Sequence, residues 1–290
     1  MNEYFEEMLN ELMGEESIRL ENRVLMVGAG QMGAPFIPLM LDTIGGESIS
    51  VIDPSEDARR KVTDTFPDIA THSSLSQLED NSFGADDWVL LAVKPNLIGK
   101  IADEVNRVGS QALIISIAVG VSLEQLEALF PFARIIRLMP NLAMLIGEGT
   151  ALLAAGDRAT QDDILHVGYM LEAGNEIFEI EESQIDVATA ISGSGPAYCA
   201  LVIDALKKAG AAEGLNERLA HDLACSTMAG TAMLLEALDH EPRELADAVQ
   251  SPGGTTERAV AVLEERGLEP MFRDAVHAAV ERAKELKNDA

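Results

Sequence analysis

The sequence predicts an α/β domain built on a parallel sheet, followed by an all-helical C-terminal domain. Two observations predict this fold class. From residue 23 onward, short apolar runs rich in β-branched residues alternate with helical segments, a pattern typical of βαβ units. After about residue 183 these runs stop, and the rest of the chain consists of helical segments separated by Pro and Gly.

Strands are expected wherever a short apolar run of the first domain has strand length and composition. Five come first, at 23–27, 48–52, 88–93, 112–117 and 134–138. Two more, at 150–155 and 176–180, flank a helical segment at 160–172. The other helices of this domain are expected at 31–44, 56–65, 95–106 and 122–129.

The C-terminal half is predicted to be helical throughout and to assemble with a second copy. Its helices are expected at 183–190, 195–213, 216–239, 243–249, 255–266 and 269–287. Many are rich in Ala and Leu on more than one face, so a single thin layer of helices would not bury them.

Three regions are therefore expected along the chain. Residues 1–22 form an acidic amphipathic extension, in which Phe5, Met8, Leu9 and Leu12 have helical spacing. The α/β domain spans 23–182, and the helical dimerisation domain spans 183–290.

Composition restricts the class of protein. The net charge of −28 argues against a nucleic-acid partner, which would require a basic surface. No apolar run is long enough for a membrane span, and the N-terminus lacks the features of a secretory signal, so a cytoplasmic protein is expected. Cys199 and Cys225 suit buried thiols, and the five histidines have no metal-ligand spacing, so no metal is predicted. The acidity fits either adaptation to high salt or an ordinary acidic cytoplasmic protein.

A glycine motif directly follows the first expected strand, in the order Gly28, Ala29, Gly30, Gln31, Met32, Gly33. Glycines at this spacing permit a tight turn and the close approach of a pyrophosphate, while the next helix offers free N–H groups. Asp53 lies 20 positions after Gly33, at the end of the second strand, as expected for a ribose-binding carboxylate. The sequence therefore predicts a Rossmann-like dinucleotide-binding domain; the alternative is a glycine turn without a ligand.

Asp53 also bears on the choice between NADH and NADPH. A carboxylate there accepts hydrogen bonds from both ribose hydroxyls of NADH and repels the 2′-phosphate of NADPH, so NADH is expected to be preferred. Arg59 and Arg60, one or two turns into the next helix, either offset that repulsion or are ordinary solvated charges.

Further motifs narrow the chemistry. They are Ala92-Val93-Lys94-Pro95, Met139-Pro140-Asn141, SGSGPAY at 192–198 and SPGGTT at 251–256. Together with the glycine motif, and in the same order, they resemble the pyrroline-5-carboxylate reductase family over residues 23–287. The resemblance implies reduction of 1-pyrroline-5-carboxylate to L-proline by hydride transfer from NAD(P)H, the last step of proline biosynthesis. It also implies a helical half that interlocks with a second copy, as a homodimer or a ring of dimers.

The resemblance places particular residues at the two sites. Ala92, Val93, Lys94 and Pro95 are expected beside the cofactor, and Ala118 and Asn141 near its nicotinamide end. Lys94 at the end of a parallel strand suits a ligand, although a solvated charge is the alternative. Asn141 has both a donor and an acceptor for a carboxamide, or it simply forms a turn.

The SPGGTT segment is the expected substrate site. Its predicted binding residues are Ser251, Gly253, Gly254, Thr255 and Thr256. A helix start here offers N–H groups and a partial positive charge to a small carboxylate. Thr256 is the first choice for the contact with the ring nitrogen and Thr255 the second; the alternative role for either is to cap the helix. The SGSGPAY motif is expected to serve packing.

The sequence departs from the family pattern in three places. Asp53-Pro54 stands where Asn-Arg is common, Leu142-Ala143 replaces Thr-Pro, and Val119 replaces an alanine. Three other functions stay open: reduction of a related cyclic imine carboxylate, dehydrogenation of a 2-hydroxy acid, or nucleotide binding without catalysis.

Overall fold

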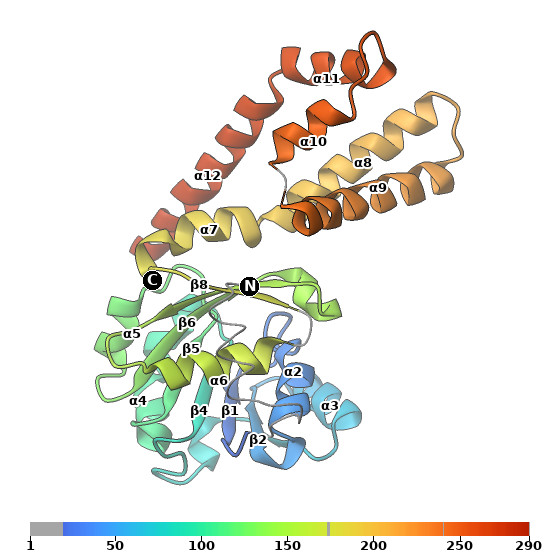
Figure 1. Cartoon of the computed structure of the whole chain (residues 1–290). Helices are drawn as coiled ribbons and strands as arrows, with labels where there is room; N and C mark the ends of the chain where they lie inside the picture. Colours follow the sequence, from blue (N-terminus) through green and yellow to red (C-terminus); the bar gives the residue numbers. More distant parts are fainter. Residues whose placement is uncertain (1–19, 173–174, 240, 290) are drawn as a thin grey trace. The chain divides into compact units, whose positions relative to one another are not determined.

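The computed structural model describes residues 20–172, 175–239 and 241–289 (Figure 1). The chain divides into two compact units. The sheet unit comprises Met1–Gly193 and Val280–Ala290, and the helical unit comprises Ser194–Ala279. Residues 1–19 of the predicted N-terminal helix are not among the described residues. From Leu20 the chain is described: this residue is buried, and its N–H donates to the carbonyl of Thr43 at 2.8 Å.

Within the described residues, eight strands form the sheet, in the order β3-β2-β1-β4-β5-β6-β7-β8. Their bounds are β1 Val24–Val27, β2 Ile49–Ile52, β3 Ala70–His72, β4 Trp88–Leu91, β5 Leu113–Ser116, β6 Arg134–Pro140, β7 Thr150–Ala155 and β8 Glu176–Glu179. All neighbours are parallel except β6 and β7. The order reverses at β1 and β4, so the carboxyl ends of these two strands form the crevice in which such sheets bind ligands.

All seven expected strands are present, but β3 was not predicted. Its three residues, Ala-Thr-His, contain no apolar run, and β3 is held by pairing with β2. A parallel sheet was expected, and this is correct except for one pair of strands, because β7 runs antiparallel to β6.

Helices cover both faces of the sheet. Their bounds are α2 Phe36–Thr43, α3 Glu56–Thr65, α4 Pro95–Gly109, α5 Leu123–Leu129, α6 Gln161–Glu172 and α7 Ile185–Ser192. One apolar cluster joins the sheet to α2 and α6, and a second joins its other face to α4 and α5 (Figure 1). Strand residues alternate between the clusters: Val24 and Met26 face one, Leu25 and Val27 the other. Burial on both faces explains why the strands are continuously apolar.

The helix predicted at 31–44 begins only at Phe36. The preceding residues form turns, in which the Ala34 N–H donates to the carbonyl of Gly30 and the Phe36 N–H to that of Gly33. Pro35 directly precedes the helix and suits its start, because proline has no N–H to leave unpaired and glycines 30 and 33 are poor helix formers.

The helical unit contains α8 Gly195–Ala212, α9 Glu217–Leu238, α10 Pro242–Ala248 and α11 Thr255–Glu265. Helix α12, Leu268–Asp289, begins in this unit, and its residues from Val280 belong to the sheet unit. These bounds agree closely with the predicted helices. In the described part of the chain, no helix is both long and apolar enough to span a bilayer.

Candidate functional site

Two of the three motif glycines are required by the protein itself. Gly28 has a φ of +101°, and a Cβ there would lie 2.6 Å from the carbonyl oxygen of Ala92. A Cβ at Gly33 would lie 2.3 Å from the carbonyl oxygen of Gly28. At Gly30, by contrast, a Cβ would meet no protein atom within 4 Å. Its open side is where a ligand can approach the backbone closely.

Asp53 ties the glycine loop to the end of β2. Its Oδ2 accepts the N–H of Ala29 at 2.8 Å, and its Oδ1 accepts the N–H of Ser55 at 2.8 Å. A carboxylate has about four acceptor positions, so both oxygens retain capacity for ribose hydroxyls. Asp53 therefore holds the loop in shape and still presents charge at the expected ribose position.

The two arginines of α3 differ in placement. The Nη1 of Arg59 donates to the carbonyl oxygen of Asp53 at 2.7 Å, which keeps this half-buried side chain at the end of β2. Arg60 is exposed and pairs with Asp57 one turn back along the helix. Of the two arginines, Arg59 is therefore the one held beside Asp53.

Two adjoining clefts run along the carboxyl edge of the sheet. The first has a volume of about 460 Å³ and includes Gly28, Asp53, Ser73 and Ser74 in its lining. The second, of about 440 Å³, includes Gln31, Met32, Pro95 and Ala118. Both clefts are lined by Gly30, Ala92, Val93 and Lys94.

The shared lining makes the two clefts one continuous groove from Asp53 to Ala118, the arrangement that an extended dinucleotide requires. Of the predicted cofactor residues, Ala29, Gly33 and Asn141 do not line the groove. Lys94 is exposed in its middle, and among the described residues it forms no salt bridge. Its ammonium group is thus free to meet a phosphate or the solvent.

Ser73 and Ser74 were missed by sequence reasoning, although they line the first cleft. They directly follow β3, the strand that was not predicted. Recognition of β3 would have placed both hydroxyls at the carboxyl edge of the sheet.

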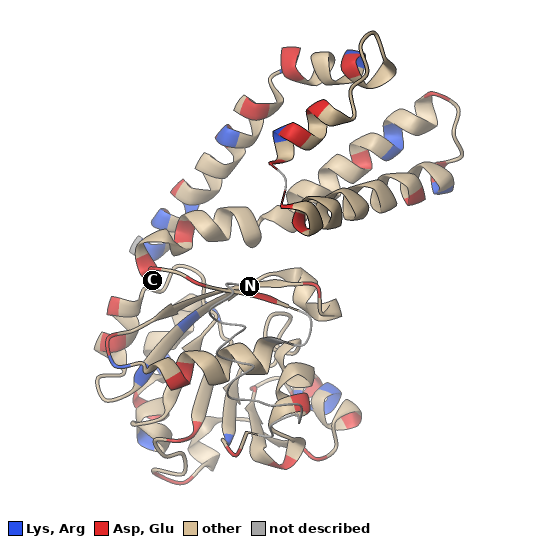
Figure 2. Cartoon of the chain, in the orientation of Figure 1, with Lys and Arg blue, Asp and Glu red and all other residues tan. Residues whose placement is uncertain are grey.

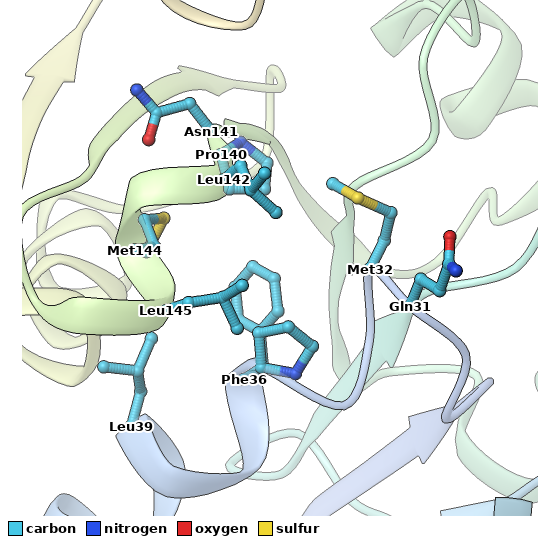
Figure 3. Close-up of a pocket in the computed structure, with 10 residues that line it drawn as sticks. Gln31, Met32, Phe36, Leu39, Pro140, Asn141, Leu142, Met144 and Leu145 are labelled. Atoms are coloured by element: carbon cyan, nitrogen blue, oxygen red, sulfur yellow. The ribbon is translucent and has the colours of Figure 1, made fainter. Parts of the chain in front are cut away.

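A small apolar pocket adjoins the glycine loop (Figure 3). Met32, Phe36 and Leu39 line one side of it, and Leu142 and Leu145 line the other. The two leucines belong to a short 3-10 helix, Leu142–Ile146, which follows β6. Of the two residues that depart from the family pattern here, Leu142 lines this pocket and Ala143 does not.

Asn141 is engaged by the protein itself. Its Oδ1 accepts the N–H groups of Ala143 and Thr150, both at 3.1 Å, and its Nδ2 donates to the carbonyl of Ser192 at 3.3 Å. Figure 3 shows the amide directed away from the apolar pocket. These contacts favour the turn-forming role, and the contact with a carboxamide stays a prediction.

The SPGGTT loop is closed by its own backbone. Gly253 has a φ of +72°, and its N–H donates to Oε2 of Glu257 at 2.6 Å, so this N–H is already used. The N–H of Gly254 donates to the carbonyl of Ser251 at 2.8 Å, and a Cβ on Gly254 would lie 2.4 Å from the Ser251 Oγ. The glycine at 254 is therefore needed for the turn into α11.

Neither threonine caps α11. The cap residue is Gly254, no side chain caps the helix, and Thr255 and Thr256 are its first two residues. The capping alternative is therefore wrong, because the hydroxyls are not used on the helix end. Thr255 is exposed and Thr256 half-buried, beside N–H groups that have no acceptor within the helix.

The sheet order, the glycine loop and the acidic residue after β2 define a nucleotide-binding protein of the Rossmann class. A family model described as "NADP oxidoreductase coenzyme F420-dependent" matches residues 23–120, and one described as "Pyrroline-5-carboxylate reductase dimerisation" matches residues 182–286. A pyrroline-5-carboxylate reductase of Synechocystis sp. is 34% identical over 90% of this chain and 97% of its own. Its counterpart from Methanosarcina acetivorans is 34% identical over 92% and 99%.

A solved structure has the same fold. Plasmodium falciparum pyrroline carboxylate reductase with NADP bound superposes with a TM-score of 0.81 at 29% identity, covering 93% of this chain and 99% of that one. This chain belongs to the pyrroline-5-carboxylate reductase family. The predicted family and fold class are thus confirmed. Family membership makes the protein an oxidoreductase, and the matches support a nicotinamide cofactor and assembly into a homo-oligomer.

Proposed function

We propose that this protein reduces 1-pyrroline-5-carboxylate to L-proline with a hydride from a reduced nicotinamide, as the last step of proline biosynthesis. The observation that carries the proposal is the start of α11, where Thr255 and Thr256 have hydroxyls that no capping role uses. The groove from Asp53 to Ala118 supports the cofactor half of the reaction. The relatives at 34% identity carry the same activity in their names.

The protein's contribution to this reaction is to bind and orient. When bound, the nicotinamide supplies the hydride. The loop Gly28–Gly33 would hold the pyrophosphate, Asp53 the ribose, and Lys94 a phosphate oxygen. Transfer requires the nicotinamide C4 to lie about 3–3.5 Å from the imine carbon.

The SPGGTT loop would hold the substrate. Its carboxylate would meet the free N–H groups at the start of α11, where the helix dipole favours negative charge. The Thr256 hydroxyl would contact the ring nitrogen, with Thr255 as second choice and Ser251, Gly253 and Gly254 shaping the loop. These motifs contain no strong general acid, so the imine would bind already protonated or take its proton from water.

The preferred cofactor would be NADH. Asp53 lines the groove at the ribose position, and Pro54 occupies the place of a phosphate-binding arginine. Arg59 would partly offset the repulsion of the NADPH 2′-phosphate, since its guanidinium is hydrogen-bonded to the Asp53 carbonyl. The test is the ratio of kcat/KM for NADH and NADPH in the unmodified protein and in Asp53→Asn. The amide keeps one acceptor for the loop N–H groups, which Asp53→Ala would lose. A higher kcat/KM with NADPH in the unmodified protein would overturn the preference.

The assembly would be a homodimer or a ring of dimers, built through the helical domain at 183–290, while the domain at 23–182 would bind the cofactor. The protein would act in the cytoplasm, without nucleic-acid or membrane partners.

The experiment for the activity is oxidation of NADH or NADPH by the purified protein with pyrroline-5-carboxylate, with proline measured as the product. Pyrroline-2-carboxylate and piperideine-carboxylates serve as competitors. A higher kcat/KM for one of these would select the related cyclic imine. Cofactor binding with no turnover on any of them would select the non-catalytic homologue.

A further inference from the structure

Arg137 is a buried arginine in the middle of the apolar sheet. It lies on β6, and only 2% of the residue is exposed. Its Nη1 pairs with Oε1 of Glu182 at 2.7 Å and its Nη2 with Oδ1 of Asp186 at 3.5 Å. A guanidinium at this depth requires such partners, because an unpaired buried charge is strongly destabilising.

Glu182 connects this arginine to the loop at the nicotinamide end of the groove. The same Oε1 accepts the N–H of Leu123 at 3.2 Å. Leu123 is the first residue of α5 and follows a loop whose residues Ile117, Ala118 and Val119 line the second cleft. The carboxylate thus joins the end of the groove loop to β6.

Helix α7 is fastened to β6 at both ends. Asp186 lies in its first turn and meets Arg137, and the carbonyl of its last residue, Ser192, accepts the amide of Asn141, the residue directly after β6. Ser192 also begins the SGSGPAY motif. One strand therefore sets the positions of both the groove loop and the segment that leads into the helical unit.

The hydrogen-bonding capacity of this ionic cluster is not fully used, as it would be in a cluster that served only to stabilise the fold. Among the described residues, the Nε of Arg137 and the Oε2 of Glu182 are buried without a hydrogen-bond partner. Apolar residues of similar volume often stabilise a core as well as a buried ion pair does, or better. An arginine adds a geometric constraint that apolar residues lack, because its planar guanidinium group fixes the positions of two carboxylates at once.

We propose that Arg137 is a positioning residue for hydride transfer, acting through Glu182 and Asp186 on the loop Ile117–Ser122 and on α7. The inference rests on the proposed function. It assigns Arg137 no contact with cofactor or substrate. Loss of the guanidinium should let the groove loop shift, and a displacement of about 1 Å is enough to slow transfer by up to a hundredfold.

The test compares Arg137→Met, Arg137→Lys and Glu182→Gln with a matched control, Arg134→Met. Arg134 lies on the same strand and pairs with Asp163 of α6 at 2.9 Å, away from the groove loop. For each variant the measurements are kcat, KM for the imine, the Kd of NADH, the Tm, and hydrogen exchange at the Leu123 amide.

Arg137→Met should lower kcat by about tenfold or more, with the Kd of NADH within about twofold. The Leu123 amide should exchange faster, and Arg137→Lys should restore part of kcat. Arg134→Met should lower the Tm and leave kcat unchanged. A kcat for Arg137→Met within twofold of the unmodified protein, with a lowered Tm as in the control, would overturn the proposal.

Two further outcomes are distinguishable. If Arg137→Met does not fold, Arg137→Lys and Glu182→Gln decide, with unchanged kcat in both counting against the proposal. If the unmodified protein shows no turnover, the proposed function fails. Unchanged exchange at Leu123 in Arg137→Met then separately rejects the coupling of Arg137 to the loop.

Discussion

The two units of this chain bury their apolar side chains very differently. The sheet unit has apolar clusters on both faces of the sheet, and its central strands β1, β4 and β5 are entirely buried. In the described part of Ser194–Ala279 only Ala220 and Ala224 are buried, whereas Leu201 is 68% and Met233 69% exposed. The first unit completes its core within one chain, whereas the second leaves most of its apolar side chains exposed, as assembly with a second copy would require.

Charge is absent from two long stretches of the C-terminal helices. Helix α9 contains no charged residue between Asp222 and Glu236, and the stretch from Val187 to Ile203 contains none either. Figure 2 shows both stretches in tan, without red or blue, although the chain as a whole carries a net charge of −28. Helices that lack charge over several turns are suited to burial in an interface.

The largest expected effect is loss of assembly when a charge enters that apolar surface. Leu201→Asp should convert the oligomer to monomer, because an unpaired carboxylate is costly to bury. Phe132→Asp is the matched control, since Phe132 in the sheet unit is equally exposed, at 68%. Light scattering measures both masses. An unchanged mass for Leu201→Asp would contradict the claim that the exposed apolar surface of the helical unit forms the interface between copies.

Next in size is the substrate contact of the helical unit. Thr256→Ala should lower kcat/KM about ten- to a hundredfold, since a hydrogen bond to a charged partner contributes about 1.5–3 kcal/mol. The Kd of NADH should stay nearly constant. Thr63→Ala, at an exposed threonine of α3, serves as the control. Normal kinetics for Thr256→Ala would remove the threonine from the substrate site.

A pair of glycine substitutions sharpens the description of the sheet unit. Gly33→Ala should destabilise the fold by about 1–3 kcal/mol, because its methyl group would overlap the loop carbonyl. Gly30→Ala should leave the Tm nearly unchanged and raise the Kd of NADH about tenfold, because only a ligand occupies that space. Thermal melts and fluorescence titrations separate the two. Normal NADH affinity in Gly30→Ala would contradict the placement of the pyrophosphate.

The smallest expected effect is a pH dependence within the sheet unit. Burial of Asp163 raises its pKa, but hydrogen bonds from Arg134 and Thr160 outweigh this, so its pKa lies below the ordinary value. The stabilisation is therefore complete above the unfolded pKa, about 3.9, and is lost as the pH falls through the folded value. Asp163→Asn should lower the Tm by about 2–4 °C at pH 6 and by less below pH 4. A difference that grows on acidification would refute this sign.

Most strands and most helix boundaries followed from local patterns. Runs such as WVLL carry both β propensity and full burial, so seven strands could be predicted. Strand β3 could not, because Ala70–His72 is held by pairing with β2 and not by its own composition.

Side-chain partners were the least predictable part of the site. Asn141 is bound to backbone groups up to 51 positions away in the sequence. Arg137 pairs with Glu182 and Asp186, which lie 45 and 49 positions further along the chain. Such contacts depend on the order of the strands in the sheet, which spacing along the chain does not encode. The free hydroxyls of Thr255 and Thr256 likewise depended on which residue begins α11.

The most direct test of the central claim is the fate of the hydride. The purified protein is incubated with pyrroline-5-carboxylate and NADH that carries deuterium at both C4 positions, and the proline is analysed by mass spectrometry and NMR. Direct transfer to the imine carbon predicts one deuterium at C5 of proline, with one NADH consumed for each proline formed. Proline without deuterium at C5, or no proline under saturating cofactor at any salt concentration, would contradict the account.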